Sequence, residues 1–393
     1  MNSMFSLIKK VLWDKDEKIE LIQEDTLQEL QNHALVSLFI PILQSLPMHE
    51  HLREKWKKLC VLQIAHNAKC RYLEKTIQTD IPYVILKGTA AAQYYPYPEF
   101  RSLGDIDLMV KHEDFESMCS SLVENGYKEC FEKEKNEFGR HRIFSKDGII
   151  VEVHHFFALL NDEKKAKYLD DLIIHNINST HLLPDLINGL VIIEHINQHF
   201  EEGIGFRQII DWMLFVDRCL SDCQWATFYP MVEKLGLTKI TMITTRMCEM
   251  FLGLKPHEWC KDVNEKLCIL LKDYVFSSGN FGRKRNNINS PGINVLTYVH
   301  TPVGFFCLLQ ERGLINWKKA QKYAFLKPFA WLYQICRYLK NGFTRDSAIK
   351  KFVCEVKAAR ERMALFETFG VKQTSKGLAV FHNGKYSIKH KRP

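Results

Sequence analysis

The chain has 393 residues, of which 46% are hydrophobic and 25% charged, as is typical of a globular protein long enough for two or three domains. Its net charge of +8 is compatible with anionic ligands such as nucleotides but is too small to indicate nucleic-acid binding by itself. The twelve cysteines form no CxxC pair, so we expect reduced thiols in a cytoplasmic protein, without a disulfide framework or a zinc ribbon. We expect neither a signal peptide nor a membrane-spanning helix, because no uncharged apolar stretch reaches about 18 residues.

Residues 1–80 are predicted to be helical. Apolar residues recur at helical spacing over residues 17–43, with an interruption at Pro41, and again over residues 52–77. His66 lies in the second stretch, and we interpret it as a packed interface histidine rather than a ligand. We expect the second helix to bury the following side chains: Leu59, Leu62, Ile64, Ala65, Ala68, Tyr72 and Leu73.

A predicted strand and a glycine turn come next. Residues 81–86 form a largely apolar run typical of a buried strand, and Lys87 and Gly88 end that run. The sequence Thr-Ala-Ala-Ala then favours a helix start, with Thr89 available as the N-cap. A glycine at such a turn lets a phosphate approach the backbone, and a helix N-terminus favours anions. The turn is therefore a candidate phosphate site.

Two aspartates mark the following strand, predicted over residues 105–110. Asp105 and Asp107 are two positions apart, so both carboxylates point to one face of the strand. Burying two such carboxylates without a cation costs several kcal/mol. A hard divalent ion such as Mg²⁺ takes oxygen ligands of this kind, usually together with substrate phosphates. The alternative for the pair alone is a strand that ends in two solvated aspartates.

A third carboxylate follows in a predicted hairpin. A helix over residues 113–124 and strands over residues 127–131 and 141–144 precede it, and Asp147-Gly148 is a strong signal for a hairpin turn. In the strand after that turn, Glu152 and His154 alternate with apolar residues and so share one face. We expect a small mixed sheet with helices on one side. A third carboxylate placed across it from the first two would complete a two-metal site.

Three polar residues stand just before this hairpin. Arg140, His141 and Arg142 either contact a phosphate or a base, or form an exposed basic turn. The sequence leaves both interpretations open.

These stretches together carry a family resemblance. LKGTAAAQYYP, RSLGDIDLMV and VEVHHFF resemble the bacterial uncharacterised nucleotidyltransferase family, within the DNA polymerase β-type nucleotidyltransferase superfamily. The matching positions lie within residues 81–157, with a weaker similarity in later helices; they are Lys87-Gly88, Arg101, Asp105/Asp107 and Glu152/His154. The chain departs from the superfamily at the turn, which is usually Gly-Ser or Gly-Gly, and in the longer separation of Gly88 from Asp105.

The resemblance implies an enzyme that moves a nucleoside monophosphate from an NTP, for example ATP, to an acceptor hydroxyl with two Mg²⁺ ions. Asp105, Asp107 and Glu152 are the expected catalytic and metal-binding residues. The expected nucleotide-binding residues are Lys87, Gly88, Thr89, Arg101, His141, His154 and Arg207. The acceptor, whether small molecule, sugar or protein, is not identified by the sequence, and no motif supports nucleic acid. The alternative is a slow or non-catalytic module of the same fold that binds a nucleotide or a partner, such as an antitoxin.

Residues 158–393 are predicted to be almost wholly helical, with helices over residues 184–200 and 206–220. In the second of these, Arg207 and Asp211 either form a helix-surface pair worth about 0.3–0.5 kcal/mol or face the nucleotide. Residues 277–294 have the composition of a flexible loop, which is either a lid over phosphates or a solvated connection. Residues 324–340 have the composition of an aromatic-rich helix. The predicted organisation is an α+β protein in three parts. A helical segment (1–80) and a helical domain (158–393) flank the nucleotidyltransferase core (81–157).

A pair of histidines in the first of these helices has the spacing found in zinc proteases. His195 and His199 are four positions apart and share one helix face. However, Ile196 stands where a zinc protease has its general-base glutamate. We therefore favour a packed or substrate-facing pair.

Overall fold

The computed structural model describes residues 2–130, 140–160, 162–200, 202–283, 316–344 and 364–371, with residues 306, 309–310, 313–314 and 357. Its contacts divide the chain into two compact units. The first comprises residues 1–285 with 369–372, and the second comprises residues 286–368 with 373–393. All the residues discussed below as a site belong to the first unit. The predicted boundaries of three parts, at residues 80 and 157, stay a prediction.

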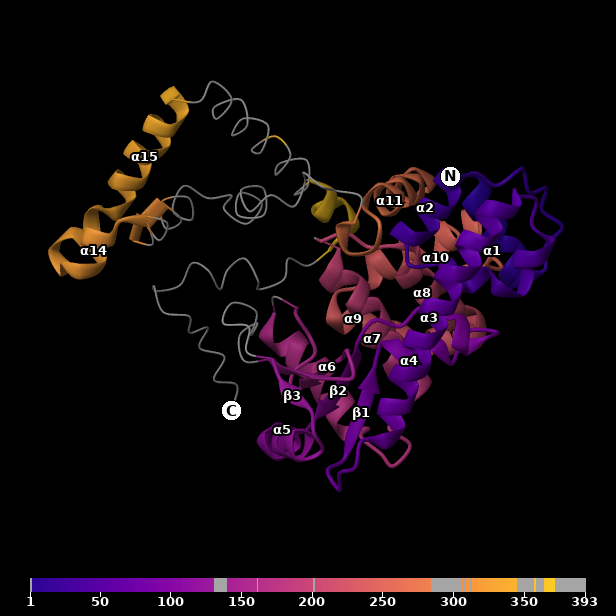
Figure 1. Cartoon of the computed structure of the whole chain (residues 1–393), viewed down its shortest axis with the longest axis horizontal. Coiled ribbons are helices and arrows are strands. Elements are labelled where there is room, and N and C mark those ends of the chain that lie inside the picture. Colours follow the sequence, from indigo (N-terminus) through magenta and orange to yellow (C-terminus); the bar gives the residue numbers. More distant parts are fainter. Residues whose placement is uncertain are drawn as a thin grey trace. The chain divides into compact units, whose positions relative to one another are not determined.

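The N-terminal region consists of helices α1 (Asn2–Trp13), α2 (Glu24–Asn32), η1 (Val36–Ser45) and α3 (Glu50–Thr76) (Figure 1). The helical stretch predicted over residues 17–43 with an interruption at Pro41 is wrong in its start and in its break, because the first helix begins at Glu24 and the break lies at residues 33–35. Helix α2 ends at Asn32, and Ala34 takes a positive φ of 56°, which turns the chain into the 3₁₀ helix η1. Pro41 lies inside η1 and lacks the N–H that an α-helix would need there.

Helix α3 confirms the predicted long helix, but its buried face differs from the predicted one. Leu62 is 68% exposed and Tyr72 is 66% exposed. The buried side chains lie at helical spacing along another stripe: Leu52, Trp56, Cys60, Asn67, Cys70 and Leu73. Of the predicted residues only Leu73 belongs to this stripe, which also contains two cysteines and an asparagine that the prediction left out. Asn67 is held there by hydrogen bonds to the backbone oxygens of Glu99 and Arg101.

The sheet has five strands in the order β1-β2-β5-β4-β3. Their bounds are β1 Tyr83–Leu86, β2 Ile106–Val110, β3 Lys128–Glu129, β4 His141–Lys146 and β5 Ile149–His154. Strands β2 and β5 are parallel and the other neighbours antiparallel, which confirms the predicted small mixed sheet. Asp147 and Gly148 both have positive φ, as a tight β4–β5 hairpin turn requires.

One face of the sheet carries the hydrophobic core of this region. Helix α5 (Phe115–Glu124), preceded by the 3₁₀ turn η3 (His112–Asp114), packs here as predicted, and Asn125 and Gly126 end it. The core also takes in the end of α3, and its members include Leu73, Ile106, Leu108, Met118, Leu122, Phe144, Val151 and Val153. Because side chains alternate along a strand, Asp107, Glu152 and His154 point to the opposite face.

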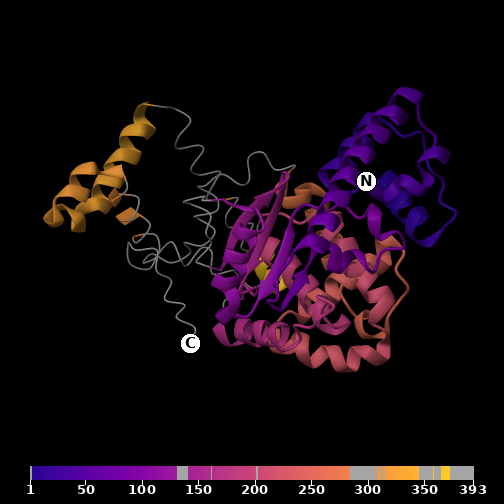
Figure 2. The same ribbon diagram turned by 60° about the horizontal axis from the view of Figure 1, so that its bottom comes forward.

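Helices follow the sheet, and they confirm the predicted α+β class. They are α6 (Glu163–His175), α7 (Asp185–His199), α8 (Phe206–Cys219), α9 (Asp222–Leu235), α10 (Thr238–Leu252) and α11 (Glu265–Ser278), with the 3₁₀ turns η4 (Glu258–Cys260) and η5 (Asn280–Gly282). Figure 2 shows these helices, in pink and orange, beside the purple and magenta strands. The predicted helices over residues 184–200 and 206–220 correspond to α7 and α8.

Two predicted segments near the end of the chain are revised. The loop expected over residues 277–294 begins later, since α11 runs to Ser278 and η5 follows; its residues 284–294 lie outside the described part. The helix expected over residues 324–340 divides at Pro328 into the 3₁₀ helix η6 (Ala324–Phe329) and α15 (Ala330–Thr344), and α14 (Lys318–Lys322) precedes them. No helix in the described ranges is long and apolar enough to cross a bilayer. The ten cysteines that the structure describes are free thiols.

Candidate active site

Three carboxylates converge on the face of the sheet opposite the core. Asp107 on β2 lies directly beside Glu152 on β5, because the parallel register pairs these two residues. Asp105 stands just before β2 and is exposed. One carboxylate oxygen from each of the three lies within 4.8 Å of the other two. The structure thus brings together all three acids that the sequence singled out.

Two cationic or polar partners complete this acidic cluster. The Nζ atom of Lys87 lies 2.6 Å from Oδ1 of Asp107. Nε2 of His154, which is fully buried, lies 3.0 Å from the same oxygen and 3.2 Å from Oε2 of Glu152. Lys87 reaches the cluster from the turn after β1, where it adopts a positive φ of 54°. The observed counter-charge of the cluster is therefore a lysine of the chain itself.

The charges of this cluster shift one another's pKa values. Burial alone would raise the pKa of Asp107, but Lys87 and then His154 outweigh it and hold the pKa below the ordinary value. Glu152 behaves alike: its hydrogen bond to His154 overcomes burial and holds its pKa well below the usual range. Loss of hydration and the neighbouring Asp107 raise the pKa of Asp105. The carboxylates of Asp107, Asp105 and Glu152 keep the pKa of Lys87 raised, although burial opposes them.

The donor set fits a divalent cation. Carboxylate oxygens of Asp105, Asp107 and Glu152 are the ligand type that Mg²⁺ or Mn²⁺ prefers, and their mutual distances allow them to share an ion. A second group, formed by His141, Glu152 and His154, meets the same distance limit with two imidazoles. Since its donors are mainly nitrogen, it suits a softer ion less typical of phosphate chemistry.

The glycine turn differs from its predicted form in one respect. Helix α4 (Gly88–Ala92) begins at Gly88, with Lys87 as its N-cap residue, so the prediction of Thr89 as N-cap is wrong. The Thr89 hydroxyl instead donates to Oε1 of Glu74 at 2.7 Å. Gly88 has a φ of 21°, which other residues rarely adopt. A β-carbon added at Gly88 would lie 3.7 Å from the backbone oxygen of Asp105. The turn therefore lies next to the acidic cluster.

Arg101 and Arg207 have separate partners. Arg101 is buried and forms a two-pronged ion pair with Asp211 at 2.8 and 2.6 Å, and Tyr95 donates a third hydrogen bond to that carboxylate. Arg207 is also buried and donates to the backbone oxygen of Ser102 at 3.0 Å. The interpretation of Arg207 and Asp211 as a helix-surface pair is therefore wrong, because both side chains are buried and Asp211 binds Arg101.

The polar residues before the hairpin divide between the site and its surroundings. The His141 ring lies 4.9 Å from that of His154 and so reaches the acidic cluster. Arg142 forms two hydrogen bonds with Glu129, both of 2.6 Å, and Arg140 donates to a backbone oxygen outside the cluster. Of the three, His141 alone joins the grouped ligand atoms in the described residues.

The two histidines of α7 form a packed pair. Their ring centroids are 4.7 Å apart in an edge-to-face arrangement, and Nδ1 of His199 lies 3.0 Å from Oε2 of Glu202. Burial, and then the neighbouring His199, lower the pKa of His195 far below its ordinary value, so its ring is neutral. Neither histidine belongs to a cluster of metal-ligand type among the described residues.

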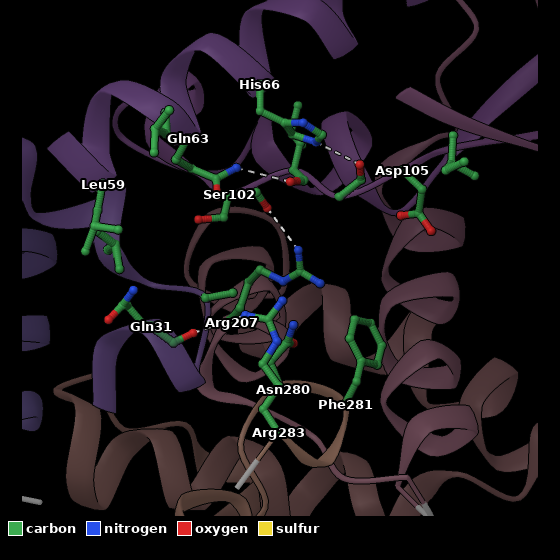
Figure 3. A pocket seen from close by; sticks show the side chains of 16 residues that line it. Gln31, Leu59, Gln63, His66, Ser102, Asp105, Arg207, Asn280, Phe281 and Arg283 are labelled. Atoms are coloured by element: carbon green, nitrogen blue, oxygen red, sulfur yellow. Dashed lines mark hydrogen bonds between the residues drawn. The ribbon is translucent and has the colours of Figure 1, made fainter. Parts of the chain in front are cut away.

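A cavity of about 540 Å³ adjoins Asp105, and most of its lining was not predicted from the sequence. Its polar wall consists of Gln31, Gln63, His66, Ser102, Asp105, Arg207, Asn280 and Arg283 (Figure 3). His66, expected to be a packed histidine, does form a hydrogen bond, from Nε2 to the backbone oxygen of Gly104 at 2.9 Å. The lining comes from residues up to 252 positions apart, at spacings that no motif connects.

The mixed sheet has a glycine turn after β1. Asp105 and Asp107 lie at β2 and Glu152 lies on β5. This arrangement is typical of a nucleotidyltransferase site. The chain belongs to the family described as "Uncharacterised nucleotidyltransferase", whose model matches residues 14–253. This confirms the family predicted from the motifs, and it supports transferase activity with a nucleoside triphosphate and a divalent metal at the general level. Comparison with curated proteins and with solved structures gave no match.

Proposed function

We propose that the protein transfers a nucleoside monophosphate from an NTP to an acceptor hydroxyl, with two Mg²⁺ ions held by the acidic cluster. The observation that supports this most strongly is the convergence of Asp105, Asp107 and Glu152, whose carboxylate oxygens lie within 4.8 Å of one another. Family membership supports the same class of reaction.

The triphosphate is placed over the turn after β1. Gly88 leaves the backbone open to a phosphate there, and Lys87 can exchange its bond with Asp107 for one with a phosphate oxygen. Asp105, Asp107 and Glu152 would hold the divalent ions, which when bound lower the pKa of the acceptor hydroxyl and offset charge on the phosphates. His154 orients the carboxylates of Asp107 and Glu152 through its two contacts.

The reaction balances without a further reactant. The acceptor oxygen forms a bond to the α-phosphorus, the bond from that phosphorus to the bridging oxygen breaks, and pyrophosphate leaves. The hydroxyl proton passes to Glu152 or to solvent. Because the pKa of Glu152 is held low, this carboxylate is ionised at neutral pH and suited to bind a metal ion, but it is only a weak proton acceptor. Arg101 supports the site indirectly, by fixing the loop before β2 through its ion pair with Asp211.

A label-transfer assay tests this function. The purified full chain is incubated with Mg²⁺, a cell extract and each α-labelled NTP in turn, and we expect label on an acceptor together with pyrophosphate release. Asp105→Asn and Asp107→Asn should each reduce transfer at least a hundredfold, whereas Asp171→Asn on the exposed face of α6 should not. Transfer that survives in both active-site variants contradicts the proposal. Tight NTP binding without pyrophosphate release would favour the binding-module alternative.

A further inference from the structure

The cavity beside Asp105 is separate from the glycine turn. Its walls come from α3, the loop before β2, α8 and the turn η5, and it holds enough space for a small-molecule ligand. Neither Lys87, Gly88 nor Thr89 is among the described residues that line it. Among the described residues, Asp105 is the one member of the acidic cluster that lines the cavity, so the cavity adjoins the cluster at Asp105.

Arg207 gives this cavity a positive charge that forms no ion pair with a described residue, although Asp211 and Asp105 are near enough to attract it. The neighbouring Arg101 is neutralised by Asp211, whereas Arg207 donates only to the backbone oxygen of Ser102, and its Nε atom is buried without a hydrogen-bond partner among the described residues. A guanidinium stays charged in proteins, and a buried charge without a counter-ion is costly. Figure 3 shows Arg207 between Ser102 and Asn280, facing the space bounded by Asp105 and Phe281.

The turn η5 supplies further recognition groups. Arg283 is exposed and adds a second guanidinium, which is held by the backbone oxygen of Gln31 at 3.2 Å. Asn280 is 2% exposed, and its Oδ1 atom is buried without a partner among the described residues, so it can accept a hydrogen bond from a ligand. The ring of Phe281 lies 5.8 Å from the Arg207 guanidinium and is partly exposed. With Leu59 and Leu62 on α3, it provides an apolar surface.

We propose that this cavity is the acceptor subsite and that the acceptor is a small molecule with a phosphate or carboxylate group, bound by Arg207 and Arg283. The inference rests on the proposed function, since it places the acceptor hydroxyl at Asp105. The apolar part of the acceptor lies against Phe281 and the α3 leucines. Arg207, expected from the sequence to contact the nucleotide, is thereby assigned to the acceptor.

Calorimetry on the full chain tests the subsite without turnover. The probes are α,β-methylene-ATP with Mg²⁺ for the triphosphate, and inorganic phosphate and acetate for the two types of acceptor anion. We expect phosphate or acetate to bind to protein already saturated with the ATP analogue. Arg207→Gln should weaken that anion at least tenfold and change the affinity for the analogue less than twofold. Arg283→Gln, at an exposed position that tolerates substitution, should weaken the anion about threefold, and Lys266→Gln, which removes the same charge outside the cavity, should have no effect.

Three results would overturn the proposal. Competition of both anions with the ATP analogue, or an equal loss of both affinities in Arg207→Gln, would make the cavity the triphosphate site. Failure of both anions to bind at millimolar concentration would remove the subsite. In the label-transfer assay, the anion that binds should inhibit in competition with the acceptor and not with the NTP. A protein that binds anion beside the analogue but transfers no label would refute the proposed function while leaving the anion site in place.

Discussion

The residue with the most consequence for the site is Lys87. Its ammonium group lies 2.6 Å from Asp107 and reduces the repulsion among the three clustered carboxylates. A divalent ion bound at Asp107 would compete with this contact, and Lys87 would then be available to a phosphate, as the proposed function requires. Alternation on two strands predicted the meeting of Asp105, Asp107 and Glu152, because the residues on one strand face are readable from spacing alone.

The ion pair between Arg101 and Asp211 could not be read in this way. The two residues are 110 positions apart, and the sequence offered Asp211 a nearer partner, Arg207, four positions away. Only the packing of α8 against the loop before β2 brings them together. Spacing along α8 favoured Arg207 as the partner of Asp211. In the structure Asp211 binds Arg101, whereas Arg207 lines the cavity.

Removing Asp211 should therefore destabilise the protein strongly. Asp211→Asn leaves the buried guanidinium of Arg101 without its counter-charge, so we expect the free energy of unfolding to fall by about 3–5 kcal/mol. Urea denaturation followed by circular dichroism measures this. Asp171→Asn, at an exposed pair with Lys167, should cost less than about 1 kcal/mol. Equal effects of the two substitutions would show that the Arg101 pair contributes no more than a surface pair.

At the scale of elements, strand and helix positions followed the sequence pattern more closely than the faces they bury. Strands β1, β2 and β4 and helices α5, α7 and α8 begin and end within about two residues of the pattern, because hairpin turns and helix ends have distinctive residues. The strand predicted over residues 127–131 is shorter, Lys128–Glu129. Helix α3 shows the limit: Cys60, Asn67 and Cys70 form its buried stripe, and the larger Leu62 and Tyr72 remain exposed. Which face of a helix is buried depends on the neighbours it meets, and these are set by tertiary structure.

Helices α7 and α8 meet closely at Gly189. A β-carbon added at that position would lie 2.2 Å from Cζ of Phe215, a fully buried ring. We expect Gly189→Ala to lower the free energy of unfolding by about 1–3 kcal/mol, because the ring has no space to move into. Thermal and urea denaturation measure the change. At Gly104 an added β-carbon meets nothing within 4 Å, so Gly104→Ala should leave stability nearly unchanged, and a neutral or stabilising Gly189→Ala would refute the close contact.

At the scale of the whole molecule, the first unit buries an acid between α7 and the segment that follows β5. Glu194 on α7 is fully buried, and burial raises its pKa to about 7 although Leu159, Asn197 and Gln198 donate hydrogen bonds to it. Nothing in the sequence marked this residue beyond its place before His195. A buried, hydrogen-bonded acid is recognisable only once the surrounding helices are assembled.

This acid should make stability depend on pH near neutrality. Between its ordinary pKa of 4.5 and about 7, folded Glu194 keeps the proton that the unfolded chain releases, so the free energy of unfolding falls as pH rises. Relative to wild type, Glu194→Gln should therefore gain up to about 3 kcal/mol between pH 5 and pH 8. Urea denaturation at several pH values measures the difference, which also cancels the contribution of other groups. A difference that is flat or that declines with pH would contradict the raised pKa.

The cavity illustrates what the sequence leaves out at this scale. Gln31, Arg207 and Phe281 are far apart in the sequence, and they line one cavity only because the fold brings them together. In contrast, the acidic cluster depends on two neighbouring strands and one register, which is why its three members were predictable while the cavity was not.

The central claim, that the acidic cluster is a divalent-cation site, is tested most directly by titrating the protein with Mn²⁺ and measuring free Mn²⁺ by electron paramagnetic resonance. We expect wild-type protein to bind Mn²⁺, and Asp105→Asn, at an exposed position that should not disturb folding, to bind it at least tenfold more weakly. Asp171→Asn should match wild type. Wild-type protein that binds no Mn²⁺, or an Asp105→Asn variant that binds it equally well, would contradict the account.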